Sequence, residues 1–109
     1  MNEQVQTELK KIFNSRFSTS ESARANYARG EDTYDPILSQ AVVFPETNEE
    51  VSKILKLCNQ NKIPVVPFGT GTSLEGNVVG NENGITICLE KMNKILDVNV
   101  EDFDCRVQA

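Results

Sequence analysis

Apolar residues recur at helical spacing near the start of the chain. Between residues 3 and 17, one side of the helix that this spacing predicts collects Val5, Leu9, Ile12, Phe13 and Phe17. The sequence therefore predicts an amphipathic helix over 3–17. The polar stretch 18–35 follows, and we expect it to be an irregular connection with one helical turn around residues 22–27. We expect Tyr27 and Tyr34 of this stretch to pack against the sheet.

Two short apolar runs in the middle of the chain are typical of strands. Residues 41–44 are all apolar and end at Pro45, and a second run covers residues 63–67. A helix of crossover length separates them. The order strand, helix, strand over residues 41–67 predicts a right-handed βαβ unit with parallel strands.

The connecting helix has signals at both of its ends. Thr47 and Glu50 stand three positions apart, which is the spacing of a capping box. The helix is predicted to continue to about Asn59, and Asn61 is a candidate for a left-handed stop. Its buried stripe is predicted to contain Val51, Ile54, Leu55 and Cys58.

Alternating apolar and polar residues predict further strands in the last third of the chain. They cover residues 85–89 and 96–100, and another strand begins at residue 104 after a turn at residues 101–103. No cap or polar tail follows this last strand. We therefore expect an unpaired sheet edge there and a longer polypeptide of which these residues are the N-terminal part.

The elements together predict an α+β fold, in which added strands with an antiparallel portion accompany the βαβ unit. We expect an N-terminal helix and connection over residues 1–35 and a second, incomplete unit over residues 36–109. With 109 residues, the chain is one small domain or a piece of a larger one. Its 39% of hydrophobic and 25% of charged residues are typical of a globular protein.

Charge and hydropathy exclude several classes of protein. The net charge is −5 and no basic run occurs, which argues against a nucleic-acid partner. No apolar run approaches the roughly 20 residues of a membrane span. Glu3 and Glu8 lie near the N-terminus without an apolar segment, so neither a secretory signal nor a transit peptide is indicated. We expect a cytoplasmic protein, or a mitochondrial one in a eukaryote.

The cysteine and histidine contents limit the chemistry. The three cysteines, Cys58, Cys88 and Cys105, are far apart and odd in number, which argues against a disulfide framework or a metal site. We expect them to be buried, reduced thiols of an intracellular protein. The chain contains no histidine, which excludes a histidine base or metal ligand within it.

The candidate functional feature is a glycine-rich loop that follows the second predicted strand of the βαβ unit. Residues 69–76 have the sequence GTGTSLEG. Glycines allow positive φ angles and close approach of a ligand, and successive N–H groups can converge on an anion. A tight connection without a ligand would use such glycines too. The position of the loop at the carboxyl end of a parallel strand favours a ligand, specifically the diphosphate of a nucleotide cofactor.

Two familiar phosphate loops fit this sequence poorly. The P-loop requires a lysine, and no lysine occurs between Lys62 and Lys91. The Rossmann pattern requires a third glycine three residues after the second, but Gly76 comes two positions too late after Gly69 and Gly71. The segment before the next predicted strand is also too short for a crossover helix.

Several motifs together resemble a known family. They are Val42–Pro45, the capped helix, the run 65–76 and the run 89–103, in which Leu-Glu-Lys-Met-Asn-Lys-Ile precedes Asn-Val-Glu-Asp-Phe. Over residues 22–109 the chain resembles the FAD-linked oxidases with a PCMH-type (vanillyl-alcohol-oxidase-like) FAD-binding domain. Within that family it is similar to the branch of D-lactate dehydrogenase and the glycolate oxidase D subunit.

The resemblance implies the first subdomain of a two-subdomain FAD domain, with FAD as cofactor and no metal. It assigns the pyrophosphate to main-chain N–H groups and hydroxyls of the loop, the approach to the two residues before the loop, and the flavin end to two residues after it. These residues are Pro67, Phe68, Gly69, Thr70, Gly71, Thr72, Ser73, Gly76 and Asn77. Family members often have glycine or histidine where this chain has Asn77.

The function implied is oxidation of a small D-2-hydroxy acid, D-lactate or glycolate, with electrons passing through FAD to an acceptor. The family's catalytic residues lie in later segments, so none is assigned here, and we expect these 109 residues alone to bind FAD weakly without turnover. One alternative is a related FAD-linked 2-hydroxyglutarate or sugar-alcohol oxidase. Another is a non-catalytic, truncated module that binds FAD or pairs its open sheet edge with a partner chain.

Overall fold

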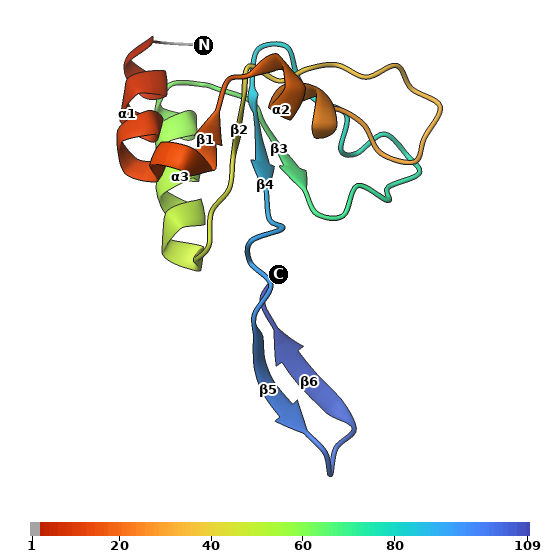
Figure 1. The fold of residues 1–109 in the computed structure, drawn as a ribbon. Coiled ribbons are helices and arrows are strands. Elements are labelled where there is room, and N and C mark those ends of the chain that lie inside the picture. The colour runs from red at the N-terminus through yellow and green to blue at the C-terminus, as the bar shows by residue number, and fades with distance from the viewer. Residues whose placement is uncertain (1–2) are drawn as a thin grey trace.

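The computed structural model describes residues 3–109 (Figure 1). It contains a four-stranded sheet in the order β1-β2-β4-β3 and a separate two-stranded sheet of β5 and β6. The strands are β1 (Phe17–Ser18), β2 (Ala41–Val43), β3 (Val65–Phe68), β4 (Ile85–Cys88), β5 (Ile95–Asn99) and β6 (Asp104–Val107). The helices are α1 (Glu3–Phe13), the 3₁₀ turn η1 (Asn14–Arg16), α2 (Glu21–Asn26) and α3 (Asn48–Gln60).

The predicted βαβ unit is present, and a further strand lies inside it. Both β2 and β3 are parallel to β4, which pairs with each of them, whereas β1 is antiparallel to β2. Ile85 of β4 is therefore the partner of both Ala41 and Val65. The sequence predicted the parallel direction of β2 and β3 but not the gap between them that β4 fills. Because β4 is central and covered on both faces, all four of its residues are buried.

Helices α1 and α3 cover one face of the sheet (Figure 1). We call these two helices and the sheet face beneath them the helical layer. The buried residues of this layer are Val5, Leu9, Phe13, Phe17, Ala41, Val43, Ile54, Cys58, Ile85 and Ile87. On α1 they recur every fourth residue, as the apolar periodicity predicted.

The other face is covered by α2 and by two long irregular segments, residues 27–40 and 69–84 (Figure 1). We call this side the loop layer. Its buried cluster is smaller and consists of Val42, Phe44, Phe68, Val78 and Cys88, with the half-buried Tyr27 packed against it. The helical turn predicted around residues 22–27 is α2, which begins after the N-cap Ser20.

Two predicted helix ends are wrong by a short distance. Helix α1 ends at Phe13 rather than at residue 17, because Asn14 takes a left-handed conformation (φ 53°) and the chain then turns into β1. At the end of α3, Asn61 has φ −105°, and Lys62 is the left-handed residue (φ 54°). The Asn61 side chain instead donates a hydrogen bond to the carbonyl of Leu57 (2.8 Å).

The capping box at the start of α3 is confirmed and extended by an ion pair. The Thr47 hydroxyl accepts from the Glu50 N–H (3.1 Å), and the Glu50 carboxylate accepts from the Glu46 N–H (2.8 Å). Arg16 donates to both oxygens of Glu50 (2.8 and 2.7 Å) and to the carbonyl of Phe44 (3.0 Å). The hydrogen bonds from Arg16 are the main cause that lowers the pKa of Glu50 to about 2.

The β5–β6 hairpin projects away from the four-stranded sheet (Figure 1). Every residue of its two strands is exposed. This arrangement corrects one expectation about the cysteines: Cys58 and Cys88 are buried, but Cys105 is exposed because its strand contacts no part of the core. Gln108 ties the base of the hairpin to the start of α3 by donating to the Glu46 carbonyl (3.0 Å).

The predicted division into residues 1–35 and 36–109 stays a prediction. In the structure, β1 of the first segment pairs with β2 of the second, and α1 contributes to the same core as α3.

Candidate functional site

The glycine loop, residues 69–76, begins directly after the carboxyl end of β3. The parallel strands β2, β3 and β4 all end at this edge of the sheet, because their registers run in the same direction. The crossover from β2 to β3 passes over the helical layer, whereas the connection from β3 to β4 passes over the loop layer (Figure 1). Crevices at the carboxyl ends of strands, where successive connections leave on opposite faces, are the usual ligand sites of open α/β sheets.

Gly71 and Phe68 fix the shape of the first half of the loop. Gly71 has φ 74°, and a Cβ atom there would lie 2.6 Å from Cζ of Phe68. The Phe68 ring is 6% exposed and makes an edge contact with Tyr27 (5.2 Å between centroids), which in turn contacts Phe44 (5.4 Å). Phe68 therefore supports the loop from below and does not face solvent. Pro67 is exposed on the outer strand of the sheet, where a residue without an N–H is tolerated.

Gly69 differs from Gly71 in its surroundings. A Cβ atom at Gly69 would meet no other atom within 4 Å, and its φ is not in the left-handed region. The space beside this glycine is therefore open, and a ligand can approach its main chain closely.

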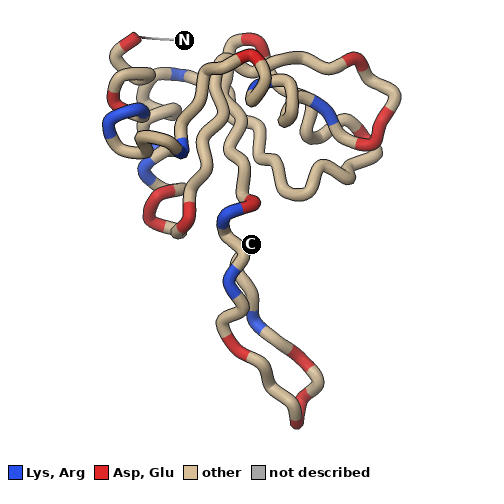
Figure 2. The backbone as a smooth tube through the Cα atoms, viewed as in Figure 1, with Lys and Arg blue, Asp and Glu red and all other residues tan. Residues whose placement is uncertain are grey.

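The side chains of the loop offer neutral hydrogen-bonding groups. The hydroxyls of Thr70 and Thr72 are exposed and lie 3.3 Å apart. The Ser73 hydroxyl donates to Oδ1 of Asn77 (2.8 Å). The segment between Lys62 and Lys91 has no basic residue, as the absence of blue along it in Figure 2 shows. An anion bound here would be held by N–H and O–H donors rather than by a cation.

Residues 28–37, which we call the clamp segment, lie beside the second half of the glycine loop. The N–H of Glu31 donates to the carbonyl of Ser73 (3.0 Å). At Gly30 a Cβ atom would lie 2.7 Å from Cγ2 of Val78 and 2.8 Å from the Ser73 carbonyl oxygen, so only glycine fits. The sequence predicts only an irregular connection over these residues, because no local pattern indicates their contact with the loop.

Tyr34 contacts the end of the glycine loop. Gly76 has φ 76°, and a Cβ atom there would lie 2.8 Å from the Tyr34 ring. The ring is 58% exposed, so the expectation that Tyr34 packs against the sheet is wrong: it packs against the loop. A shallow pocket of about 410 Å³ opens beside this contact and is lined by Tyr34, Asp35, Ile37, Glu75, Gly76 and Val79.

Tyr27 lies where the carboxyl ends of the strands meet. Its hydroxyl donates to Oε1 of Glu90 (2.9 Å), a residue that follows β4. Burial, together with this hydrogen bond, raises the pKa of Tyr27 to about 12, so the phenol stays protonated at neutral pH. Burial likewise raises the pKa of Cys58 and of Cys88 to about 11. These two thiols are unreactive at neutral pH and act as core residues.

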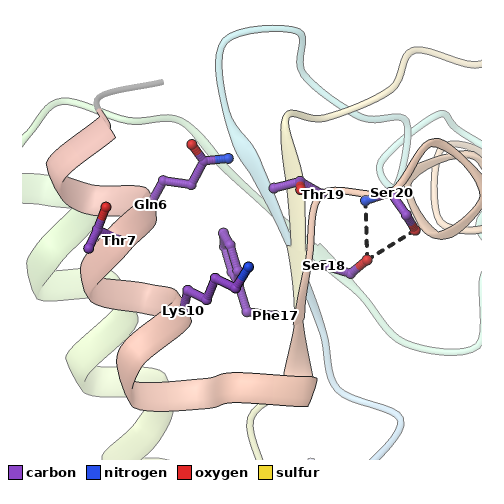
Figure 3. Close-up of a pocket in the computed structure, with 7 residues that line it drawn as sticks. All are labelled: Gln6, Thr7, Lys10, Phe17, Ser18, Thr19 and Ser20. Atoms are coloured by element: carbon purple, nitrogen blue, oxygen red, sulfur yellow. Dashed lines mark hydrogen bonds between the residues drawn. The ribbon is translucent and has the colours of Figure 1, made fainter.

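A second pocket lies beside β1, the outer strand of the sheet on the side away from β3 (Figure 3). Its volume is about 530 Å³, and it is lined by Gln6, Thr7, Lys10, Phe17, Ser18, Thr19 and Ser20. Two of these lining residues contact each other: the hydroxyl oxygens of Ser18 and Ser20 lie 3.1 Å apart. None of the residues predicted to bind a cofactor lines this pocket, so it is separate from the glycine loop.

Comparison with known proteins identifies the family. The sequence profile of the FAD binding domain matches residues 39–109. The chain belongs to the FAD-binding domain family. A probable mitochondrial D-lactate dehydrogenase of Danio rerio is 38% identical over 91 residues, which are 84% of this chain and 18% of that protein. The glycolate oxidase subunit GlcD of Bacillus subtilis is 32% identical over 92 residues, 84% of this chain and 20% of that protein.

Solved structures of other proteins show the same fold. An alkyldihydroxyacetonephosphate synthase superimposes with a TM-score of 0.87 at 22% identity, covering 99% of this chain and 24% of that one. A p-cresol methylhydroxylase superimposes with a TM-score of 0.76 at 20% identity, covering 89% and 20%. The predicted fold class and the resemblance to PCMH-type oxidases are confirmed. FAD is the cofactor of this domain, which spans about a fifth of the length of the relatives it matches.

The residues of this FAD-binding domain fit a dinucleotide cofactor. The open space beside Gly69 and the exposed threonine hydroxyls provide main-chain and side-chain donors for a diphosphate. Within residues 3–109, no group of three or more His, Cys, Asp or Glu side chains is placed to hold a metal ion. No helix in the same range is long and apolar enough to cross a membrane.

Proposed function

We propose that the glycine loop binds the pyrophosphate of FAD. The proposal depends on two neighbouring glycines with different surroundings. The space beside Gly69 is empty, whereas Gly71 packs directly against the ring of Phe68. The main chain is thus fixed from below and accessible from above, which is the arrangement that a closely approaching anion requires. Thr70, Thr72 and Ser73 add hydroxyl donors.

The nine residues assigned to the cofactor have four different roles. In this proposal the loop residues from Gly69 to Ser73 contact the diphosphate directly, and Gly76 and Asn77 lie toward the flavin. Phe68 contributes by supporting Gly71 from the core, and Pro67 borders the approach from the sheet edge.

The polypeptide that contains this domain is proposed to oxidise a small D-2-hydroxy acid, D-lactate or glycolate. The relatives named D-lactate dehydrogenase and glycolate oxidase support this substrate class. FAD held by these residues would supply the hydride-accepting chemistry needed to oxidise a hydroxyl-bearing carbon. In this proposal the residues described here bind and orient the cofactor. The 109 residues by themselves are expected to bind FAD weakly and to show no turnover. We place the protein in the cytoplasm or the mitochondrion, the latter because the Danio rerio relative is named mitochondrial.

The test is the variant Gly69→Ala in the full natural polypeptide that contains these residues. A methyl group there meets no protein atom, so the melting temperature of the apoprotein should not change. It enters the space proposed for the diphosphate, so we expect FAD affinity to fall about tenfold, the effect of losing one hydrogen bond to a charged group. Quenching of FAD fluorescence in a titration measures the affinity.

The matched control is Asn83→Ala, a change on the exposed turn before β4 that should leave FAD affinity unchanged. Wild-type affinity in Gly69→Ala would contradict the assignment of the loop to the pyrophosphate. Turnover with D-lactate, glycolate and 2-hydroxyglutarate, measured on the same wild-type preparation, distinguishes the proposed substrates from that of the related oxidases.

A further inference from the structure

Asp32 lies in the middle of the clamp segment, between the two residues that contact the glycine loop. On one side, Glu31 donates its N–H to the Ser73 carbonyl (3.0 Å). On the other, the Tyr34 ring packs against Gly76. The surroundings of Asp32 therefore depend on the position of loop residues 73–76.

The two oxygens of the Asp32 carboxylate have different surroundings. Oδ1 accepts a hydrogen bond from the Tyr34 N–H (3.0 Å). Oδ2 is buried and has no hydrogen-bond partner within residues 3–109, the part of the chain that the structure describes. A Cβ atom added to Gly30 would lie 3.3 Å from Oδ2 of Asp32 and 2.8 Å from the carbonyl oxygen of Ser73. Two acceptor oxygens thus converge on one place.

A buried carboxylate oxygen without a donor is unfavourable, because it has lost its water without gaining a replacement. Such groups are rare in folded proteins, and each calls for an explanation. Direct contact with a diphosphate is not that explanation, since phosphate oxygens are acceptors and repel a carboxylate. The donor must come from an N–H or O–H group.

We infer that Asp32 is a positioning residue for FAD, whose Oδ2 accepts a hydrogen bond from the glycine loop when the loop closes on the diphosphate. The inference rests on the proposed function of the loop. Ser73 borders the same place through its carbonyl oxygen, and its hydroxyl, which now donates to Asn77, is the donor that we assign. Gly69, beside which no other atom lies within 4 Å of a Cβ position, gives the loop the freedom to make the change. Part of the FAD affinity then comes from completing the hydrogen bonding of Asp32.

The test is Asp32→Asn in the full natural polypeptide. Asparagine keeps the size of the side chain and the Oδ1 acceptor for Tyr34, but it removes the charge and one acceptor. We expect the Kd for FAD to rise about tenfold, the effect of losing a hydrogen bond to a charged group. We expect the melting temperature of the apoprotein to stay the same or rise, because the unpaired buried charge is gone.

Two simpler roles for Asp32 predict different results. If the carboxylate acted only by its charge, its removal near a diphosphate would tighten FAD binding. If it only stabilised the clamp segment, Asp32→Asn would lower the melting temperature of the apoprotein together with the affinity. Either result, or an unchanged Kd, would overturn the inference.

Asp102→Asn is the matched control, since it makes the same change on an exposed side chain in the turn between β5 and β6, away from the glycine loop. We expect it to change neither the Kd nor the melting temperature. Wild-type protein that fails to bind FAD would overturn the proposed function along with this inference. Wild-type binding with an unaffected Asp32→Asn variant would overturn the inference alone.

Discussion

The two layers on either side of the four-stranded sheet are built in different ways. In the helical layer, large side chains such as Leu9, Phe13 and Ile54 are fully buried between α1, α3 and the sheet. In the loop layer, irregular segments pack closely against their neighbours at glycine residues, which have no side chain. At Gly30, Gly71 and Gly80 a Cβ atom would collide with atoms of neighbouring segments.

This difference explains where the candidate site lies. Regular helices present few free N–H groups, because their main chain is already hydrogen bonded within the helix. The irregular loop layer leaves main-chain donors and open glycine surface available at the carboxyl edge of the strands. The helical layer therefore provides most of the buried apolar volume, and the loop layer provides the proposed binding surface.

The largest effect is expected from removing volume in the helical layer. Leu9→Ala should lower the free energy of unfolding by about 3 kcal/mol, because the residue is fully buried and its loss leaves a cavity. Urea denaturation followed by circular dichroism measures the change. Ile12→Ala on the same helix is the control: Ile12 is 44% exposed, so its cost should stay below about 1 kcal/mol. Equal costs at the two positions would contradict the burial described for α1.

Adding volume to the loop layer should be the next largest effect. A Cβ at Gly80 would collide with the main-chain carbonyl of Ile37 in the clamp segment. We expect Gly80→Ala to cost about 2 kcal/mol of unfolding free energy, because the backbone must shift to relieve the contact. The comparison variant is Gly69→Ala, where the same methyl group meets open space. If both variants melted alike, the close packing of the loop layer would be refuted.

The smallest effect concerns the Arg16–Glu50 pair, which joins η1 to the start of α3. Its hydrogen bonds hold the pKa of Glu50 at about 2, below the ordinary value of 4.5. A lowered pKa in the folded state means that the stabilisation is complete above pH 4.5 and is lost as the pH falls toward 2. The contribution is on the order of 1–2 kcal/mol, since one pKa unit corresponds to about 1.4 kcal/mol and the pair is partly solvated.

Glu50→Gln provides the comparison for this pH dependence. The difference in unfolding free energy between wild type and variant should be largest near pH 6 and should shrink steadily below pH 4.5. A difference that does not vary between pH 6 and pH 2 would show that Glu50 acts by packing or capping alone. The unfolding free energy is measured by urea denaturation followed by circular dichroism, because the loss of α1 and α3 reports unfolding of the helical layer.

Much of the fold was predictable because its signals are local. The apolar periodicity of α1 and the Thr47 cap of α3 lie within one element each, and the structure confirms both. The alternation in β5 correctly predicted a strand, although both faces of that strand are exposed. The errors at residues 14–17 and at Asn61 are displacements of one to four positions at helix ends. Cys105 was expected in the core because it alternates with the apolar Phe103 and Val107, a local pattern that does not reveal that the hairpin stands apart.

The candidate site was only half predictable. The glycine loop itself was found from its composition and from its place after a parallel strand. Its supports were not found: the ring of Phe68 beneath Gly71 and the ring of Tyr34 against Gly76. Each joins residues that are distant in sequence or depends on a backbone angle.

The sequence by itself determined the helices and all strands except β1, the parallel direction of β2 and β3, and the location of the loop, because these depend on residue type and short spacing. Only the tertiary structure decided that β4 lies between β2 and β3, and that residues 28–37 contact the glycine loop. Strand order and segment contacts are set by how the buried surfaces of all elements fit together, and no short stretch of sequence contains that information.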